Sequence, residues 1–452
     1  MAMSEDLNRE GDLNTGAARQ AWLWGLPDAT RALLEEDAAV FLHQSMSTPC
    51  LDAIVGAEGC HLIDAGGRRI LDFHGNSAHP LGHGHPAVLA AVAAQLGELS
   101  FIPRRYTSAI AVRAARALVD RTSSGDFKVL FTPSGSAAVG LALKLARKAT
   151  GRSKVLSMWE SFHGAGLDTI SVGGEAVFSK DMGPLLPGCL KAIPYNAYRN
   201  LLGSGDPQAV ADFCLDYVEY QLRHEGDVGA ILLEPIRATD THVPPRAFFQ
   251  RLRAICDRHG VLLVFDEIPT ALGRSGAFFV HQLYDVEPDV LVLGKGLGGG
   301  VVPQAAVLAR SKLDCAGDIS LGHYTHEKPA LGCAAVCATL QAIDDHALLE
   351  RCRERSAYAA RRAAELQDRH ALVGDVRIQG LLITFELVTD RAARTPAVAQ
   401  AERVLYHCLA RGLSFKVAGG NCITWHPPLI VSEADLEFAF QVLDGALGHA
   451  AH

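Results

Sequence analysis

The segment VLVLGKGLGGG, residues 290–300, ends an apolar run with a single lysine that is surrounded by glycines. Burying a lysine without a partner is costly, because burial disfavours its charged form. The glycines remove the side chains that would otherwise fill the space beside Lys295. The segment therefore predicts a buried strand that ends at a lysine with room next to it for a ligand.

Further apolar runs lie on both sides of this segment and alternate with helical patterns. The runs are KVLF (128–131), KVLSMW (154–159), GAILLEPI (229–236), VLLVFDEI (261–268), DVLVLGK (289–295) and QAAVLAR (304–310). Near-continuous apolar runs are typical of strands that are covered on both faces. One helix is expected after KVLF and another between Pro244 and Gly260. The alternation predicts an α/β fold with a mostly parallel central sheet and helices on both faces.

The two ends of the chain have a different pattern. Strand-like fragments at residues 61–73 suggest a small meander, helices dominate residues 330–369, and a strand unit follows at residues 376–387. We expect a large cofactor-binding domain at residues 76–329. Residues 1–75 and 330–452 are expected to form a smaller α+β domain.

Composition excludes several classes of partner. The 452 residues are 49% apolar and 20% charged, with a net charge of −8 and no long basic run, which argues against nucleic acid and membrane surfaces. No apolar stretch has the length of a membrane span, and the polar N-terminus has no signal-like core. Eleven scattered cysteines do not form a disulfide framework, and Cys333 and Cys337 are interpreted as buried small residues rather than zinc ligands. We expect a cytoplasmic protein without a metal.

Three predicted strand ends carry side chains that suit one cofactor. Ser134, Gly135 and Ser136 open the helix after KVLF, where backbone N–H groups favour an anion such as phosphate. Asp266 and Lys295 end two other runs. Because ligands in open α/β sheets bind beyond the carboxyl ends of the strands, these groups are expected to meet.

Taken singly, these features are also explained by a helix cap, a carboxylate at the sheet edge and a lysine whose ammonium group reaches water. Taken together, they are what pyridoxal phosphate requires. Lys295 forms a Schiff base with the cofactor aldehyde, and Asp266 keeps the pyridine nitrogen protonated so that the ring withdraws electrons. The residues predict a pyridoxal phosphate enzyme with Lys295 and Asp266 as catalytic residues.

The order of motifs resembles the class-III aminotransferase family, which has the fold-type I pyridoxal phosphate-dependent transferase fold. The resemblance extends over about residues 62–447. Its landmarks are LDFHGNSAHPLGHGHPAV, TPSGSAAVGLALKLAR, SFHGAG, LLEPI, VFDEIPTALGRSG, GKGLGGG, HYTHEKPALGCAA, VRIQGL and PPLIVSE.

The resemblance implies a role for several residues. Phe162 is expected to stack on the cofactor ring with His163 beside it, and Ile268 to pack on the opposite face. Gly135 and Ser136 are expected to hold the phosphate, joined by Thr325 of a second subunit. The family resemblance therefore implies a homodimer with shared active sites.

The chain departs from the family at two positions. Pro269 replaces the glutamine that usually contacts the ring hydroxyl, and Thr424 replaces the arginine with which most family transaminases bind an α-carboxylate. A transaminase must bind an oxoacid as its second substrate, whereas a lyase needs one substrate only. The loss of this arginine therefore favours a lyase.

Cationic side chains elsewhere in the sequence suit a doubly charged phosphonate substrate. Arg104 and Arg105 in FIPRRYT and Lys328 in HYTHEKP are the candidate substrate contacts, together with Thr424, although a surface role for the arginine pair stays open. The segments FLHQSMSTPCLD, DFHGN, FIPRRYT and SFHGAGLDTISVGGEAVF also resemble a phosphonate-degrading branch of the family. We expect an ammonia-lyase that converts a hydroxylated aminoethylphosphonate to phosphonoacetaldehyde and ammonia. The alternative is a transaminase that acts on an ω-amine or an aminophosphonate; a protein that only binds the cofactor is disfavoured.

Overall fold

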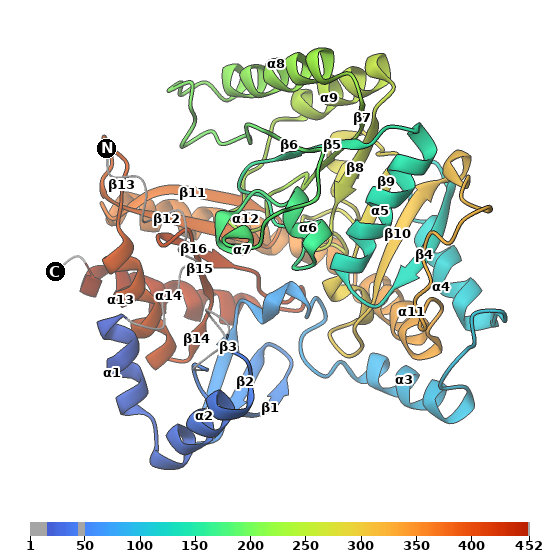
Figure 1. Cartoon of the computed structure of the whole chain (residues 1–452). Helices are drawn as coiled ribbons and strands as arrows, with labels where there is room; N and C mark the ends of the chain where they lie inside the picture. The colour runs from blue at the N-terminus through green and yellow to red at the C-terminus, as the bar shows by residue number, and fades with distance from the viewer. Residues whose placement is uncertain (1–15, 44–49, 451–452) are drawn as a thin grey trace.

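A seven-stranded sheet forms the centre of the molecule in the computed structural model, which describes residues 16–43 and 50–450 (Figure 1). Its strands are β4 (Phe127–Thr132), β5 (Lys154–Met158), β6 (Cys189–Ala192), β7 (Val228–Leu233), β8 (Leu262–Asp266), β9 (Val290–Leu293) and β10 (Ala305–Arg310). They lie in the order β4-β10-β9-β8-β7-β5-β6. β5 to β9 pair in parallel, and only β10 is antiparallel to its neighbours β4 and β9. The predicted, mostly parallel sheet is confirmed.

Most strands are shorter than the apolar runs that predicted them, whereas β4 extends one residue beyond KVLF at each end. β7 ends at Leu233, before Pro235, because proline has no N–H group for the ladder. β9 ends at Leu293, and Lys295 has a φ of 44° at the start of a 3₁₀ turn, Lys295–Gly298. β6, with the sequence CLKA, was not predicted, because four residues with a lysine give no apolar run.

Alternate residues of the central strands enter two separate apolar cores. Val264, Val292 and Val307 pack with the long helix α5 (Gly135–Thr150) on one face of the sheet. Leu263 and Leu291 enter the core on the other face. That core also contains α3 (Pro86–Glu98), α4 (Ala109–Val119), α8 (Pro207–Glu225), α9 (Arg246–His259) and α11 (Ala330–Asp345). Helices therefore cover both faces, as predicted (Figure 1).

Segments from the two ends of the chain form two smaller sheets. β1 (Ile54–Glu58), β2 (His61–Asp64) and β3 (Arg69–Asp72) form the predicted meander, and the C-terminal β14 (Leu413–Ser414) pairs in parallel with β3. The other sheet contains β11 (Val373–Gln379), β12 (Leu382–Asp390), β16 (Cys422–Trp425) and β15 (Lys416–Ala418), with β13 (Thr395–Pro396) paired to β12. Figure 1 shows the blue N-terminal segment beside the red C-terminal one.

Trp425 joins these segments in one apolar core. Its indole is fully buried and packs edge-to-face on Phe73, Phe385 and Phe440, with ring centroids 5.3, 5.1 and 5.2 Å away. Phe73 comes from the N-terminal part of the chain, whereas the other rings come from its C-terminal part. The exact domain boundaries, at residues 75/76 and 329/330, stay a prediction.

The remaining helices connect or cover these sheets. They are α1 (Ala17–Gly25), α2 (Asp28–Val40), α6 (Leu167–Val172), α7 (Ala176–Ser179), α10 (His281–Tyr284), α12 (Leu348–Arg369), α13 (Val398–Ala410) and α14 (Glu433–Ala450), with 3₁₀ turns at Gly75–Ser77 and Ser311–Leu313. The helical stretch predicted at residues 330–369 is divided between α11 and α12, because Ala347 has a left-handed φ of 48°.

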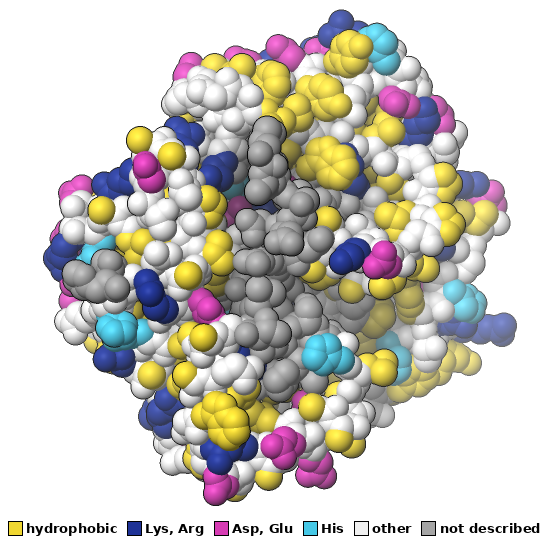
Figure 2. Space-filling model, turned by 60° about the vertical axis from the view of Figure 1, so that its left-hand side comes forward, with side chains coloured by type: hydrophobic (Ala, Val, Ile, Leu, Met, Phe, Trp, Pro, Cys, Tyr) yellow, Lys and Arg dark blue, Asp and Glu magenta, His cyan; other side chains and the backbone are white. Residues whose placement is uncertain are grey.

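The surface mixes charges of both signs. On the face drawn in Figure 2, Lys and Arg side chains alternate with Asp and Glu side chains and with apolar ones. Within residues 16–43 and 50–450, no helix combines the length and the apolar composition that crossing a bilayer requires.

Candidate active site

A cavity of about 440 Å³ lies beyond the carboxyl ends of the central parallel strands. Residues that follow β4, β5, β7, β8 and β9 all contribute to its wall, as expected for an open α/β sheet. The lining residues are His74, Asn76, Ser77, Gly135, Ser136, Phe162, His163, Gly164, Ala165, Glu175, Phe178, Glu234, Ala238, Thr239, Asp266, Ile268, Pro269, Lys295, Lys416, Thr424 and His426.

Lys295 presents its side chain to this cavity. Its backbone is left-handed, with a φ of 44°, a conformation that non-glycine residues rarely adopt. The side chain is exposed toward the hollow, but the surrounding protein removes it from bulk water. This desolvation lowers the pKa of Lys295, although Asp266 and Glu234 act in the opposite direction. The amine is therefore easier to deprotonate than an ordinary lysine.

Asp266 is held rigidly at the end of β8 and is only 1% exposed. Its Oδ1 accepts a hydrogen bond from the backbone N–H of Ile268 at 3.0 Å, and its Oδ2 lies 2.8 Å from Nδ1 of His163. Nε2 of His163 is buried without a hydrogen-bond partner in the part of the chain that the structure describes. His163 therefore fixes the Asp266 carboxylate in position.

The N-terminus of α5 forms the part of the wall that suits an anion. Ser134 caps this 16-residue helix, because its side chain accepts a hydrogen bond from the N–H of Ala137 at 3.2 Å. Ser136 also contributes to the wall, and its Oγ accepts a hydrogen bond from the N–H of Ala165 at 3.2 Å.

Glycines keep this part of the wall open. A Cβ at Gly135 would lie 2.7 Å from Cδ1 of Ile268, and a Cβ at Gly164, which has a φ of 127°, would lie 2.2 Å from Oγ of Ser136. A side chain at either position would therefore require its neighbours to move. A lysine, a buried carboxylate and a helix N-terminus that Gly135 leaves open fit pyridoxal phosphate.

Most of the predicted site residues lie together at this cavity. The lining includes Gly135, Ser136, Phe162, His163, Asp266, Ile268, Lys295 and Thr424, and Ser134 lies behind it as the helix cap. Thr424 is 2% exposed, and its hydroxyl donates a hydrogen bond to the carbonyl of Thr239 at 3.0 Å. Pro269 also lines the cavity but has no side-chain donor. The chemical roles assigned to these residues stay predictions.

Four other predicted residues lie outside the lining of this cavity. Arg104, Arg105, Thr325 and Lys328 are exposed on the surface of the chain. Thr325 was predicted to act in the site of a second subunit, so its position in one chain does not test its role. The substrate contacts of the other three residues likewise stay predictions.

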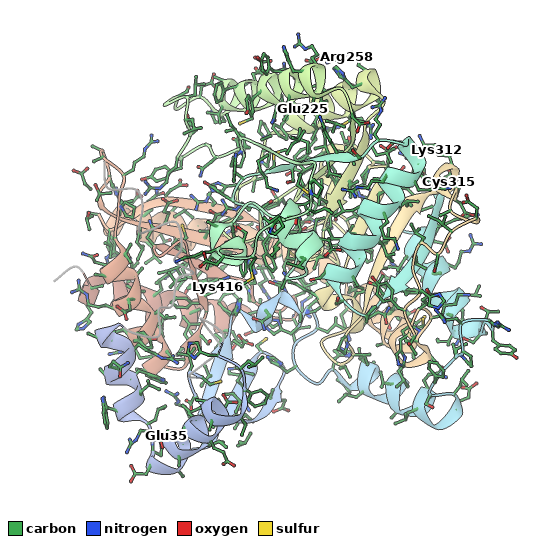
Figure 3. The ribbon with its side chains drawn as sticks, in the orientation of Figure 1. Glu35, Glu225, Arg258, Lys312, Cys315 and Lys416 are labelled. Carbon is green, nitrogen blue, oxygen red and sulfur yellow. The ribbon has the colours of Figure 1, made fainter. Side chains whose placement is uncertain are left out.

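Several polar residues of the cavity were missed by the sequence interpretation. Glu234 follows β7 directly, just as Asp266 ends β8, so the same strand-end signal was present in LLEPI. Lys416 begins the three-residue strand β15, which is too short to show a pattern. Figure 3 shows Lys416 near the middle of the molecule, whereas Arg258 and Lys312 lie at its outside.

Two histidines of the cavity are poor bases. Burial is the main cause that lowers the pKa of His74 to about 4, and burial also lowers the pKa of His426 well below its usual value. Nδ1 of His426 lies 2.6 Å from Oγ of Ser77. The lowered pKa values favour neutral imidazoles near pH 7 at both positions.

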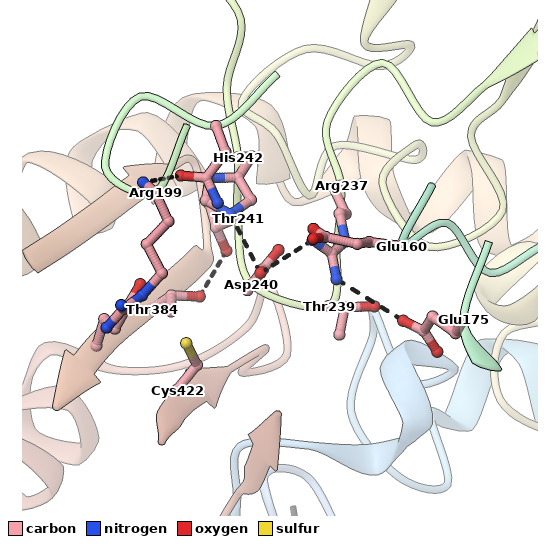
Figure 4. A network of polar contacts seen from close by, with 12 residues as sticks. Glu160, Glu175, Arg199, Arg237, Thr239, Asp240, Thr241, His242, Thr384 and Cys422 are labelled. Atoms are coloured by element: carbon pink, nitrogen blue, oxygen red, sulfur yellow. Dashed lines mark hydrogen bonds and ion pairs between the residues drawn. The ribbon is translucent and has the colours of Figure 1, made fainter. Parts of the chain in front are cut away.

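A polar network supports the wall behind Thr239 (Figure 4). The guanidinium group of Arg237 lies 2.7 Å from Glu160, 3.2 Å from Asp240 and 3.8 Å from Glu175. Although burial alone lowers the pKa of Arg237, these carboxylates outweigh it and raise that pKa. The ion pairs hold the loop that contacts Thr424.

A separate cluster, Asp72, His79 and His83, brings three possible metal-ligand atoms within 4.8 Å of one another. Hydrogen bonds already join these three residues. Nε2 of His83 lies 3.0 Å from Oδ2 of Asp72, and Nε2 of His79 lies 3.2 Å from the Asp72 carbonyl oxygen. The cluster connects β3 to the segment that follows it.

Comparisons with known proteins agree with this geometry. The model of the family Aminotransferase class-III matches residues 43–447. An (R)-1-hydroxy-2-aminoethylphosphonate ammonia-lyase from Vibrio splendidus (strain 12B01) is 46% identical over 452 residues, covering 97% of this chain and 94% of the relative. A succinylornithine transaminase from Yersinia enterocolitica serotype O:8 is 32% identical, covering 85% of this chain and 89% of the relative.

Solved structures share the fold. An amine transaminase from an uncultivated Pseudomonas species, in a form with bound pyridoxal phosphate, matches with a TM-score of 0.87 and 31% identity, covering 91% of this chain and 99% of that one. The family model and the fold extend over nearly the whole chain. The chain therefore belongs to the class-III aminotransferase family of fold-type I enzymes, which depend on pyridoxal phosphate.

Proposed function

We propose that the chain is a pyridoxal phosphate-dependent ammonia-lyase that converts (R)-1-hydroxy-2-aminoethylphosphonate to phosphonoacetaldehyde and ammonia. The Vibrio splendidus relative is named as an ammonia-lyase for the same compound. The observation that carries this proposal is Thr424. Its short neutral side chain is buried and donates to Thr239, so the position offers no cation to the α-carboxylate of an oxoacid. Among the described residues that line the cavity there are two lysines and no arginine.

The cofactor, when bound, withdraws electrons from the carbon that bears the amine and so makes its proton removable. Lys295 would hold the cofactor through its aldehyde, and its amine would take the proton from the substrate carbon. Its lowered pKa supports this role, because a base must be neutral before it accepts a proton. Asp266, fixed by His163, holds a proton on the ring nitrogen.

The rest of the wall positions the cofactor. Gly135 and Ser136 hold the phosphate at the N-terminus of α5, which Ser134 caps. Phe162 and Ile268, which line the cavity, would hold the ring between them. In a homodimer, Thr325 of one subunit completes the phosphate site of the other.

A phosphonate dianion requires cations near its oxygens. Lys416 presents an ammonium group to the cavity and pairs across the sheet with Thr424 through the register of β15 and β16. Arg104, Arg105 and Lys328 are the surface cations proposed to join it when two subunits associate. The eleven cysteines are all free, which supports a reducing cytoplasm as the location.

The test is ammonia release by the purified holoenzyme with no oxoacid supplied. The panel contains the hydroxyaminophosphonate, its phosphate-ester analogue, β-alanine and alanine, and phosphonoacetaldehyde is trapped as a hydrazone. We expect equal amounts of aldehyde and ammonia from the hydroxyaminophosphonate. Transfer from alanine or β-alanine to an oxoacid, with no elimination from either phosphorus compound, would establish the transaminase alternative instead.

A further inference from the structure

His426 is a buried imidazole in the cavity wall with one ring nitrogen left for a ligand. The residue is 5% exposed, and its Nδ1 lies 2.6 Å from Oγ of Ser77. Its Nε2 is buried and has no hydrogen-bond partner within residues 16–43 and 50–450. A buried polar atom without a partner is costly, so its presence in a cavity wall indicates a ligand that supplies the missing hydrogen bond.

The backbone on both sides of this contact is held in place. The N–H of His426 donates a hydrogen bond to the carbonyl of Phe73 at 2.6 Å. Asn76 and Ser77 have left-handed φ values of 48° and 58°. Two consecutive non-glycine residues in this conformation cost free energy, and such strain is concentrated at ligand-binding sites. The strained turn places Oγ of Ser77 against the imidazole.

His426 shares its part of the wall with Thr424 and Lys416. Alternate residues of a strand project to the same face, and His426 follows β16 two residues after Thr424. Lys416 pairs directly with Thr424 across the sheet, so its side chain projects to that face as well. All three residues line the cavity. This wall therefore combines an ammonium group, a short hydroxyl side chain and an imidazole.

Lys295 lies between this wall and the carboxyl groups at the ends of β7 and β8. Burial is the main cause that shifts the pKa of Glu234 and that of His426, and nearby charges contribute to both shifts. The charges that act on Glu234 include Asp266 and Lys295, whereas those that act on His426 include Lys295 and Lys416. A substrate whose amine lies at Lys295 therefore has the His426 wall on the side away from Asp266.

The groups of this wall suit an anion. The lining residues that the structure describes include two lysines, of which Lys295 is assigned to the cofactor and Lys416 is left for a substrate. A neutral imidazole adds an N–H donor without adding a second positive charge beside Lys416. Within the described chain, Nδ1 of His426 is the partner of the Ser77 hydroxyl. If this hydroxyl donates to Nδ1, the ring hydrogen lies on Nε2, where a ligand oxygen can accept it.

We propose that Nε2–H of His426 donates a hydrogen bond to an oxygen of the substrate phosphonate, beside the ammonium group of Lys416, and that Ser77 positions the ring. The proposal rests on the proposed ammonia-lyase function, which supplies the phosphonate. It gives His426 a role in substrate binding and leaves the proton transfer at carbon to Lys295. A hydrogen bond to a charged oxygen favours a phosphonate over an uncharged group of similar size.

The first test measures binding without turnover. The enzyme is loaded with cofactor, so that the probe does not occupy the phosphate site at α5. Ethylphosphonate, which has neither an amine nor a hydroxyl group, is the probe, and calorimetry gives its Kd. His426→Leu removes both ring nitrogens at similar size and should raise this Kd by about 10- to 100-fold, as expected for one hydrogen bond to a charged group.

Two further variants control this measurement. His426→Gln keeps an N–H donor on a side chain of similar length and should recover most of the affinity for ethylphosphonate. His85→Leu is the matched control, because Nδ1 of His85 is also buried without a partner in the part of the chain that the structure describes, but His85 lies outside the cavity lining. It should bind ethylphosphonate as tightly as wild type. Circular dichroism and cofactor absorbance show that each variant is folded and loaded, and His426→Met replaces His426→Leu if that variant is not.

Kinetics separate binding from chemistry. With the hydroxyaminophosphonate, His426→Leu should raise KM by the same factor while kcat stays within a few-fold of wild type, because the contact is made equally in the bound substrate and in the transition state. Ser77→Ala should raise KM in the wild-type background but not in the His426→Leu background, since Ser77 acts through the imidazole. Additive effects of the two changes would overturn the positioning role of Ser77.

The outcomes separate this inference from the proposed function. Wild-type enzyme that binds ethylphosphonate but releases no ammonia from the hydroxyaminophosphonate would overturn the proposed function and leave the anion site in place. The same Kd for wild type and His426→Leu, or no binding of ethylphosphonate to wild type, would overturn the phosphonate contact. A loss of kcat at unchanged KM in His426→Leu would also overturn it, because the residue would then act in the chemical step.

Discussion

Replacing Asp266 by asparagine tests the electrostatic part of the mechanism. Asparagine has nearly the same shape and keeps an oxygen for the N–H of Ile268, so the fold should be retained. The change removes one negative charge from a residue that is 1% exposed. At an effective dielectric constant of about 20, a charge pair about 4 Å apart is worth about 4 kcal/mol, or about three orders of magnitude in rate.

The assay is kcat for ammonia release at saturating substrate, with cofactor content measured in the same sample. Thermal unfolding and circular dichroism confirm that the variant is folded. We expect kcat to fall by about 1,000-fold while the cofactor is still bound. A folded, fully loaded Asp266→Asn variant with kcat within about tenfold of wild type would refute the assignment of Asp266 to the ring nitrogen.

Four other variants test three separate parts of the account. Lys295→Ala should leave no cofactor-modified lysine peptide after borohydride reduction, and mass spectrometry that finds the modification on another lysine would contradict the assignment. Trp425→Ala should destabilise the protein by about 3–5 kcal/mol because its ring is fully buried, which a urea titration measures as a lower midpoint; an unchanged midpoint would refute its structural role. Arg104→Ala and Arg105→Ala are tested singly against the aminophosphonate, and at least one variant should have a raised KM. An unchanged KM in both variants would contradict a role of this arginine pair in substrate binding.

Much of the central fold was predictable because burial on two faces leaves a simple pattern. The runs around Val264 and Val292 are apolar throughout, since alternate residues enter two different cores. β6 and β15 were missed because short strands that carry lysines do not produce such runs.

The site was predictable where a polar residue interrupts an apolar strand end, as at Asp266 and Lys295. Glu234 produced the same signal and was overlooked as a residue of the cavity wall, because Asp266 already supplied a carboxylate. Lys416 was not predictable, since only the pairing of β15 with β16 brings it beside Thr424. Arg104 and Arg105 formed a plausible anion site in the sequence, whereas the structure places both on the surface of the chain, outside the cavity lining.

The most direct test of the lyase proposal follows the nitrogen atom of the substrate. The purified holoenzyme is incubated with ¹⁵N-labelled (R)-1-hydroxy-2-aminoethylphosphonate in the presence of both 2-oxoglutarate and pyruvate. The buried, neutral Thr424 predicts that the label appears in ammonium, in an amount equal to the phosphonoacetaldehyde formed. Label recovered in glutamate or alanine instead would show amino transfer and contradict the ammonia-lyase function.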